Sequence, residues 1–353
     1  MNGAGASMVA APLVRGNSAA SGAPLLSVSH LTKHYPLRRG LFGRARDAVH
    51  AVDDVSFAIA DGETLGLVGE SGCGKSTIAR TVLRLIEPTS GVIEWRGQPI
   101  QQLAASAMRP HRRELQAVFQ DPYASLNPRM RAADIVAEPI RNFETASAAS
   151  IMGRVRALLA RVGLRDDQMM RYPYEFSGGQ RQRLGIARAL ASRPSLIVCD
   201  EPVSALDVSV QAQVINLLAD LQQEFALSYL FVAHDLAVVE HISHRVAVMY
   251  LGRIVELAPT RALFGNPLHP YTEALLSAVP VPDPGARRKR LILAGDVPSP
   301  TNLPAGCRFH TRCPYAFDRC RHEEPRLAQM SPAHLVACHL RDAPPAAKPD
   351  MAH

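Results

Sequence analysis

Gly69-Glu-Ser-Gly-Cys-Gly-Lys-Ser-Thr77 matches the pattern G-x4-G-K-[ST], and this stretch decides the predicted fold. The five residues Thr64–Val68 before it are mostly apolar and predict a buried strand. Residues Ser76 to Ile86 after it carry apolar side chains at helical spacing, and Pro88 predicts the end of that helix. A strand, a glycine-rich loop and a helix in this order favour a phosphate-binding loop over an ordinary glycine-rich turn.

The residue types in the loop suit a chain of phosphate groups. Glycines let backbone N–H groups turn toward phosphate oxygens with no Cβ in the way, and the start of a helix adds the positive end of its dipole. Lys75 would place a full charge on the β- and γ-phosphates, and Ser76 would offer a hydroxyl to Mg²⁺. We therefore expect a nucleoside triphosphate site.

A second stretch, Leu196-Ile-Val-Cys-Asp-Glu201, places two carboxylates at the end of a predicted buried strand. Ligands bind at the carboxyl ends of strands in open α/β sheets. Asp200 would hold Mg²⁺, through water, and Glu201 could polarise an attacking water. Alone, the pair could be an ordinary acidic turn at a strand end; beside the phosphate loop it predicts hydrolysis.

The hydrophobic pattern predicts an α/β fold. Residues 25–60 alternate apolar and polar, as in antiparallel strands with one solvated face, and the apolar runs 117–119, 196–199 and 229–233 indicate strands of a mostly parallel sheet. Helical patterns over about residues 121–190 indicate an inserted helical subdomain. We interpret residues 1–24, rich in Ala, Gly and Ser, as a flexible tail rather than a secretory signal.

Composition excludes some classes of protein. Apolar residues make up 47% and charged residues 20%, which rules out wholesale disorder, and the longest apolar runs are of strand length, too short to span a bilayer. The net charge of +7 is spread along the chain. Its densest clusters, at residues 38–46 and 287–290, are short, so we interpret them as solvated loops, with a nearby anionic membrane surface as the alternative.

Glu175-Phe-Ser-Gly-Gly-Gln-Arg-Gln-Arg183 resembles the signature of ABC ATPases, with Phe where Leu is more usual. The resemblance covers about residues 25–340. It implies a P-loop ABC ATPase cassette at 25–265, with a RecA-like parallel sheet core, an antiparallel β subdomain and the helical subdomain at about 121–190. It also implies a small Cys-rich C-terminal module at 266–353.

The resemblance assigns roles to particular positions. Glu201 and His234, the switch histidine, would be catalytic, and Mg²⁺ would be held by Ser76, Asp200 and Gln120 of the Q-loop. Taken without the family, His234 and Gln120 could be structural residues at strand ends. The residues expected to bind ATP are Tyr35, which would stack on adenine, with Gly69, Glu70, Ser71, Gly72, Cys73, Gly74, Lys75, Ser76, Thr77 and Gln120.

The signature itself predicts a second anion site, because Ser177-Gly-Gly-Gln180 opens a helix. One chain has no obvious use for two phosphate sites so far apart in sequence. Two chains packed head-to-tail would use both, with the signature of one closing over the ATP held by the other. The residues expected to contact the partner's ATP are Ser177, Gly178, Gly179, Gln180 and, in the D-loop, Asp207.

Three longer strings, at residues 120–130, 201–213 and 266–276, look like oligopeptide/dipeptide importer ATPases. Residues 32–42 are most similar to the second of the two ATPase subunits in such systems. This implies a heterodimer with a sister ATPase, two membrane permeases and an external peptide-binding protein, at the cytoplasmic face of the membrane and without nucleic acid. Residues 121–150 are the candidate contact for a permease helix.

Other functions stay open. Nickel importers share this architecture, so the substrate is less certain than the mechanism. A soluble ABC ATPase acting on ribosomes or DNA usually carries two cassettes or a very long coiled coil before the signature, and neither is present here. A non-hydrolysing regulator is a third class, against which the intact Glu201 speaks.

Four cysteines, Cys307, Cys313, Cys320 and Cys338, crowd into the C-terminal region. In a cytosolic protein such a set indicates a metal site more than disulfides, although the CxxC pairs of zinc ribbons are missing. Four thiolates suit Zn²⁺ or a 4Fe–4S cluster, and His310, His322 and His339 are spare candidate ligands. The family resemblance implies the cluster, with zinc, or no metal, as the alternatives.

Overall fold

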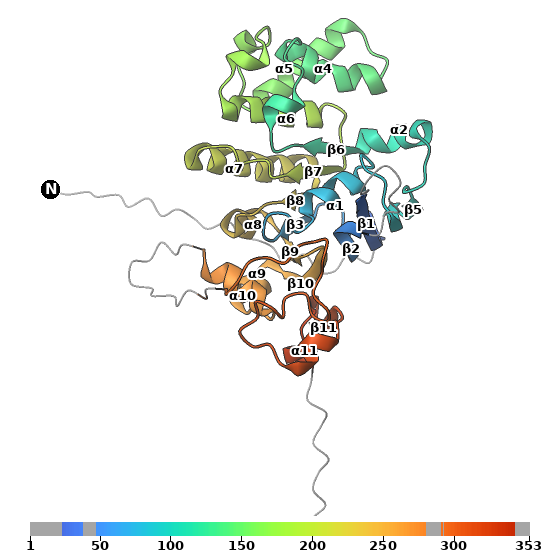
Figure 1. Ribbon diagram of the computed structural model, residues 1–353. Helices are drawn as coiled ribbons and strands as arrows, with labels where there is room; N and C mark the ends of the chain where they lie inside the picture. Colours follow the sequence, from blue (N-terminus) through green and yellow to red (C-terminus); the bar gives the residue numbers. More distant parts are fainter. Residues whose placement is uncertain (1–22, 38–46, 280–290, 292, 343–353) are drawn as a thin grey trace, which may run out of the picture.

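The computed structural model describes residues 23–37, 47–279, 291 and 293–342 (Figure 1). Several sequence predictions fall outside these residues. They are nearly all of the tail at 1–24, the basic clusters at 38–46 and 287–290, and the end of the stretch 32–42.

A small antiparallel sheet has the strand order β2-β1-β4-β5. Its strands are β1 (Leu26–Leu37), β2 (Asp47–Ile59), β4 (Ser90–Trp95) and β5 (Gln98–Pro99). The inward side chains of β1 and β2, such as Leu26, Val28 and Ile59, are buried in one core cluster. This confirms the antiparallel strands predicted from the alternation of apolar and polar residues.

The larger sheet has the order β11-β12-β10-β9-β3-β8-β7-β6. Its parallel strands are β3 (Thr64–Val68), β6 (Leu115–Val118), β7 (Leu196–Asp200), β8 (Ser228–Val232) and β9 (Arg245–Tyr250). Every residue of β3, β7 and β8 is buried, because layers pack on both faces of the sheet. The predicted strands lie within two residues of these bounds.

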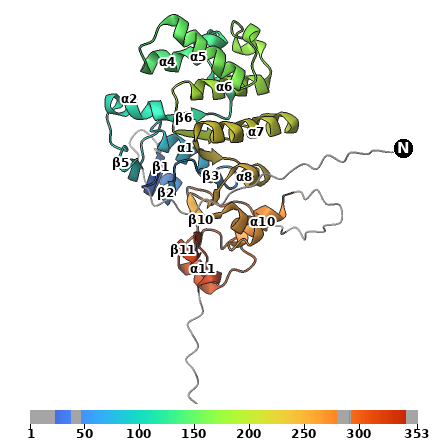
Figure 2. The same cartoon turned by 180° about the vertical axis from the view of Figure 1, so that it is seen from behind.

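Helices α1 (Lys75–Val82), α2 (Ala105–Glu114), α7 (Val208–Phe225) and α8 (Leu236–Ile242) pack around the sheets (Figure 2). The prediction that the first of them runs to Ile86 is wrong by four residues. Arg84 has φ 54°, in the left-handed region that ends a helix, and Leu85 is left 56% exposed.

Four helices gather at one end of the molecule, shown at the top of Figure 1. They are α3 (Pro122–Ser125), α4 (Ala132–Phe143), α5 (Ala148–Arg161) and α6 (Gly178–Leu190), with single 3-10 turns at Asp166–Gln168 and Pro173–Glu175. Ile135, Val155 and Leu184 are fully buried where α4, α5 and α6 meet. The inserted stretch therefore has an apolar core that continues into that of the sheet.

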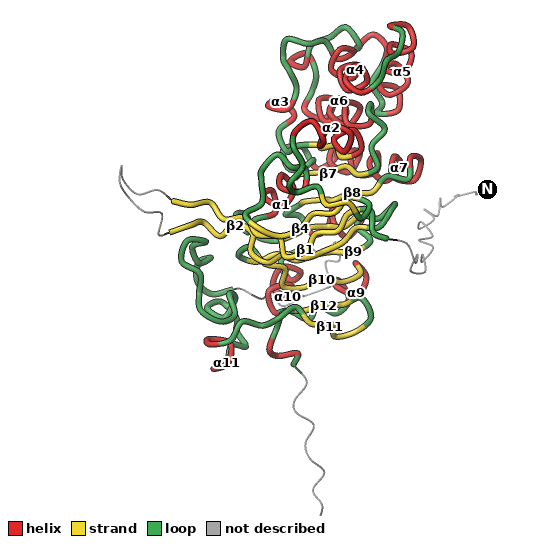
Figure 3. The backbone as a smooth tube through the Cα atoms, turned by 90° about the vertical axis from the view of Figure 1, so that its right-hand side faces the viewer, coloured by secondary structure: helices red, strands yellow, loops and turns green. Residues whose placement is uncertain are grey.

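The residues after 265, for which the sequence predicts a separate module, continue the larger sheet. They form α10 (Pro270–Ser277), α11 (Asp318–His322), β11 (Ala328–Ser331), β12 (His334–Val336) and a 3-10 turn at His339–Arg341; α9 (Thr260–Gly265) precedes them. β12 pairs with β10 (Arg253–Pro259), itself antiparallel to β9 (Figure 3). Tyr271 and Phe309 lie in the main core. No helix among the described residues combines the length and apolar character needed to cross a membrane.

Candidate nucleotide-binding site

The glycine-rich loop joins β3 to α1 and has a backbone that only glycine adopts easily. Gly74 has φ 107°, and a Cβ there would lie 2.0 Å from the backbone oxygen of Ala51 in β2. Ser71 and Gly72 face solvent at the mouth of the loop. The Lys75 side chain is buried, and its Nζ donates to the carbonyl oxygens of Gly69 (2.7 Å) and Glu70 (3.0 Å). The loop therefore carries a fixed positive charge.

The next residue in α1 faces the end of β7. Ser76 Oγ donates to Asp200 Oδ1 at 2.7 Å. Burial raises the pKa of Asp200, and the hydrogen bond from Ser76 opposes that shift. A hydroxyl and a carboxylate beside a phosphate site are hard oxygen ligands of the kind that Mg²⁺ takes, so the donor set fits this ion.

Glu201 lies at the meeting point of three strand ends. Its Oε2 is 3.1 Å from Gln120 Nε2, which follows β6, and 3.4 Å from His234 Nδ1, which follows β8. Its φ of 49° is uncommon for a side-chain-bearing residue, and its N–H donates to the Val232 oxygen (3.0 Å). The structure thus brings together the three residues that the sequence predicts at the reacting end of a nucleotide.

Tyr35, expected to stack on adenine, lies on β1 opposite Val49 of β2. Val49 is two residues from Ala51, whose backbone oxygen would lie 2.0 Å from a Cβ at Gly74. The Lys33 ammonium lies 5.0 Å from the centroid of the Tyr35 ring. The strand pair that carries Tyr35 therefore borders the phosphate loop, although the Tyr35 ring itself makes no hydrogen bond to it among the described contacts.

The signature residues lie at the start of α6. Ser177 Oγ accepts from the Gln180 N–H (3.3 Å), and Gln180 Oε1 accepts from the Ser177 N–H (3.0 Å), which makes a capping box. A Cβ at Gly179 would lie 2.4 Å from a methyl carbon of Val210 in α7. Ser177, Gly178 and Asp207 are exposed. No hydrogen bond or ion pair among the described residues joins the signature to the phosphate loop of its own chain.

Two residues at this site were not found from the sequence. Arg312 donates from Nη1 to Glu70 Oε2 (2.7 Å) and from Nη2 to Glu70 Oε1 (3.1 Å), and the Tyr271 hydroxyl accepts from the Glu70 N–H (2.8 Å). Tyr271 belongs to a stretch that the sequence singles out only by resemblance, and Arg312 lies between two of the cysteines. No local pattern links residues this far apart.

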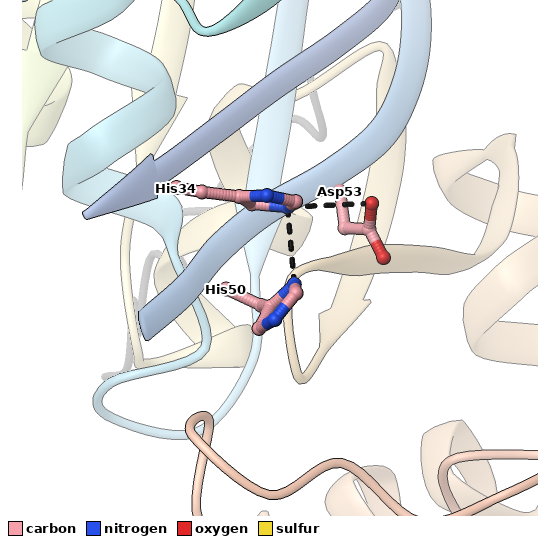
Figure 4. Close-up of side chains that lie close together, drawn as sticks. All are labelled: His34, His50 and Asp53. Atoms are coloured by element: carbon pink, nitrogen blue, oxygen red, sulfur yellow. Dashed lines mark hydrogen bonds and ion pairs between the residues drawn. The ribbon is translucent and has the colours of Figure 1, made fainter. Parts of the chain in front are cut away.

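A group of two histidines and an aspartate lies on β1 and β2 (Figure 4). His34 Nε2 is 3.1 Å from His50 Nδ1 and 3.6 Å from Asp53 Oδ1. The other Asp53 oxygen pairs with Arg308 and, at 3.6 Å, with Arg253. Burial and the charge of His34 lower the pKa of His50. With two guanidinium groups beside it, we interpret the group as a structural network and not as a cation site.

The four C-terminal cysteines line one small cavity together with His310 and His339. None is in a disulfide, and no three of their sulfur atoms lie within 4.8 Å of one another. Sulfur atoms around one zinc ion would be closer, roughly 3.8 Å apart for Zn–S bonds of about 2.3 Å. Four free thiols around one cavity match the four Cys ligands of a 4Fe–4S cluster in number and in chemistry.

Two family models match the chain. The model described as ABC transporter matches residues 52–204, and the model described as oligopeptide/dipeptide transporter, C-terminal region, matches residues 255–320. The first match contains the phosphate loop, the signature and the Asp200–Glu201 pair.

Curated relatives and solved structures agree with these matches. The probable peptide ABC transporter ATP-binding protein y4tS of Sinorhizobium fredii is 59% identical over 92% of this chain and 91% of its own length. The oligopeptide transport ATP-binding protein AppF of Bacillus subtilis is 53% identical over 92% and 99%. The dimeric cassette MJ0796 bound to ADP and Pi has a TM-score of 0.60 at 28% identity, over 67% of this chain and 99% of its own. The chain therefore belongs to the ATP-binding proteins of the ABC transporter family.

Proposed function

We propose that this chain is the ATP-hydrolysing subunit that powers import of di- or oligopeptides across the cytoplasmic membrane. The observation that carries the proposal is the meeting of Gln120, Glu201 and His234 at one strand edge, beside the Ser76–Asp200 pair. The peptide substrate is supported by the match to the oligopeptide/dipeptide transporter C-terminal region and by relatives named for peptide transport.

The residues divide the reaction between them. Backbone N–H groups of the loop and the Lys75 ammonium would bind the phosphates, and Ser76, Asp200 and Gln120 would hold Mg²⁺, which neutralises charge developing on phosphate oxygens. Glu201 would orient the attacking water as general base, while His234 contacts the same water or the γ-phosphate. The left-handed backbone of Glu201 aims its carboxylate at Gln120 and His234.

The second half of the site would come from a partner, a sister ATPase. The signature residues Ser177 and Gly178 and the D-loop residue Asp207 are exposed, and no hydrogen bond or ion pair in the described part of the chain joins them to their own phosphate loop. A head-to-tail pair would let each signature close over the nucleotide held by the other chain, and hydrolysis would remove the shared phosphate and open the pair. The similar cassette MJ0796 is itself a dimer.

Two permeases and an external binding protein would complete the transporter, with this chain at the cytoplasmic face of the membrane. Exposed apolar side chains near the Q-loop support a docking surface for a permease helix. Tyr123 is 56% exposed, Met170 58% and Tyr174 62%. Arg181 links two of these side chains, because its guanidinium lies 3.7 Å from the centroid of the Tyr123 ring and its Nε donates to the oxygen of Pro173, next to Tyr174. Exposed apolar groups that lie together mark interaction sites more than ordinary surface.

We further propose that Cys307, Cys313, Cys320 and Cys338 hold a 4Fe–4S cluster. The support is that four free thiols line one cavity and match the four Cys ligands of such a cluster in number and in chemistry. Anaerobic purification followed by iron, sulfide and zinc analysis tests this. Iron and sulfide near four atoms each per chain, with the visible charge-transfer absorbance, are expected. Stoichiometric zinc, or no metal at all, would contradict it.

Reconstitution tests the function. The chain is purified in complex with its proposed permeases and sister ATPase and placed in vesicles with the proposed binding protein. ATP-dependent uptake of labelled peptides is expected, and it should disappear in the matched vesicles carrying Glu201→Gln. Uptake of Ni²⁺ without uptake of peptides would establish the nickel alternative instead.

A further inference from the structure

A buried arginine of the C-terminal region neutralises an acid of the phosphate loop. Glu70 is the second residue of that loop, and both of its carboxylate oxygens accept hydrogen bonds from Arg312, at 2.7 and 3.1 Å. The Arg312 side chain is 8% exposed, whereas that of Glu70 is 29% exposed. Paired parallel bonds of this kind require the planar guanidinium group, which lysine cannot replace.

The negative charge of Glu70 is unfavourable in a loop that binds an anion. The loop around it collects N–H groups and the Lys75 ammonium for a polyanion, and a free carboxylate there would repel phosphate oxygens. The hydrogen bonds to Glu70 raise the pKa of Arg312, so the guanidinium group stays charged. The pair is therefore neutral overall and leaves the positive potential of the loop undiminished.

The backbone of Glu70 is held by the same region. Its N–H donates to the hydroxyl of Tyr271 (2.8 Å), and the Tyr271 ring packs 5.4 Å from the ring of Phe309 and 4.8 Å from that of Tyr250, between centroids. Phe309 and Arg312 both lie between Cys307 and Cys313. Residues 307–313, here called the cysteine loop, therefore buttress the phosphate loop through one ion pair and one aromatic cluster.

The cysteine loop also reaches the strand pair beside the nucleotide site. Arg308 pairs with Asp53 of β2 and donates to the Leu251 oxygen. Asp53 lies two residues from Ala51, whose oxygen fills the space that a Cβ at Gly74 would take. Arg312 of the cysteine loop thus holds the phosphate loop at Glu70. Arg308 holds β2, the strand that lies against the phosphate loop at Gly74.

We infer that Arg312 is a positioning residue for ATP binding: by neutralising and orienting Glu70, it lets the cysteine loop set the affinity of the phosphate loop without touching the nucleotide. This rests on the proposed function, because the anion concerned is the triphosphate of ATP. It also goes beyond it, since it gives the C-terminal region a direct role at the nucleotide site.

The test measures binding of a non-hydrolysable ATP analogue with Mg²⁺ to the purified full chain by calorimetry. Arg312→Ala should weaken binding by about tenfold, equivalent to ~1.4 kcal/mol, because it exposes the loop to the Glu70 charge. Adding Glu70→Gln to Arg312→Ala should restore most of that affinity, since the unpaired charge is then gone. The matched control is Arg319→Ala, which removes an exposed arginine paired with Glu323 in the same region and should bind like the wild type.

The rescue separates positioning from folding. If Arg312 only supported the fold, removing Glu70 as well could not restore binding, so a double variant as weak as Arg312→Ala would overturn the inference, as would normal binding by Arg312→Ala. If thermal unfolding shows that Arg312→Ala does not fold, Arg312→Gln replaces it. Its binding is then compared with and without Glu70→Gln in the same way. A wild-type chain that binds the analogue but supports no peptide uptake in vesicles would contradict the proposed function and not this inference, whereas a wild-type chain that binds no nucleotide would overturn both.

Discussion

Ser76 Oγ donates a 2.7 Å hydrogen bond to Oδ1 of Asp200, although 124 positions separate the two residues in the chain. The sheet explains the contact. β3 and β7 both pair in parallel with β8, so the loop after β3 and the last residue of β7 lie at the same edge. One hydroxyl and one carboxylate are thereby placed next to the phosphate loop.

This pair predicts how the activity depends on Mg²⁺. Asp200→Asn should lower Mg²⁺-dependent ATP hydrolysis by about 10–100-fold, because an amide is a weaker partner for the ion and its waters than a carboxylate. Nucleotide binding in the absence of Mg²⁺ should persist. The measurement is phosphate release across a Mg²⁺ titration, with the exposed Asp220→Asn as control. An unchanged Mg²⁺ dependence would remove Asp200 from the ion site.

Glu201 is expected to act in the chemical step and not in binding. Glu201→Gln should reduce turnover by about 10²–10⁴-fold, the usual contribution of a general base, while ATP is still bound. The Gln120 amide and the His234 ring should retain contacts with the glutamine oxygen at the same place. Single-turnover hydrolysis and nucleotide binding are measured in parallel, with the exposed Glu240→Gln as control. Equal turnover in variant and wild type would exclude Glu201 from catalysis.

The part of this site that the sequence predicts is the part built from local signals. Gln120, Glu201 and His234 each follow a strand of the parallel sheet, and parallel strands end at a common edge, so their order already predicts their meeting. The strand before the phosphate loop follows from a run of apolar residues. The end of α1 does not, because the left-handed backbone of Arg84 leaves no trace in the apolar pattern.

The C-terminal region shows what sequence reasoning missed. β12, His334–Val336, is three residues long, which is too short for an alternating pattern, and its pairing with β10 depends on partners far away in the chain. The ion pair of Arg312 with Glu70 is of the same kind. The chain has many charged residues, and no sequence pattern indicates which arginine pairs with Glu70 in the folded structure.

Cys73 is predicted to be unreactive in the folded chain despite its place in the phosphate loop. It is 4% exposed, and burial raises its pKa, an effect that the nearby Lys75 charge only partly offsets. Because the thiolate is the nucleophile, alkylation by iodoacetamide at neutral pH should be much slower than for an exposed thiol and should speed up as the pH rises. Mass spectrometry of the digested protein measures it.

Once Cys73 is alkylated, the added group has no space inside the loop and should block binding of ATP. Cys199, fully buried in β7, is the internal comparison and should react more slowly still, since its side chain is less exposed than that of Cys73 and burial raises its pKa as well. Rapid complete labelling of Cys73 at neutral pH would contradict the first expectation. Full nucleotide binding after verified alkylation of Cys73 would contradict the expected block of ATP binding.

His269 should make the stability of the chain depend on pH. The side chain is 2% exposed at the start of α10, where its Nδ1 accepts from the Tyr271 N–H at 3.0 Å, and burial, helped by the charge of Arg341, lowers its pKa to about 3. The unfolded chain binds this proton below its ordinary pKa of 6.5 and the folded chain does not. The free energy of unfolding therefore falls as pH drops from 6.5 toward 3.

His269 alone should lower the free energy of unfolding by about 2 kcal/mol between pH 7 and pH 5, since only the unfolded chain takes up its proton over that range. His269→Asn can keep the cap on the Tyr271 N–H but removes the titration, so its stability should fall less steeply between the same two values. Urea unfolding at pH 7, 6 and 5 measures both profiles. Comparing the slopes cancels the contribution of every other titrating group, which is the same in both proteins. Parallel profiles would mean that His269 takes up its proton in the folded chain, and that burial does not hold it neutral.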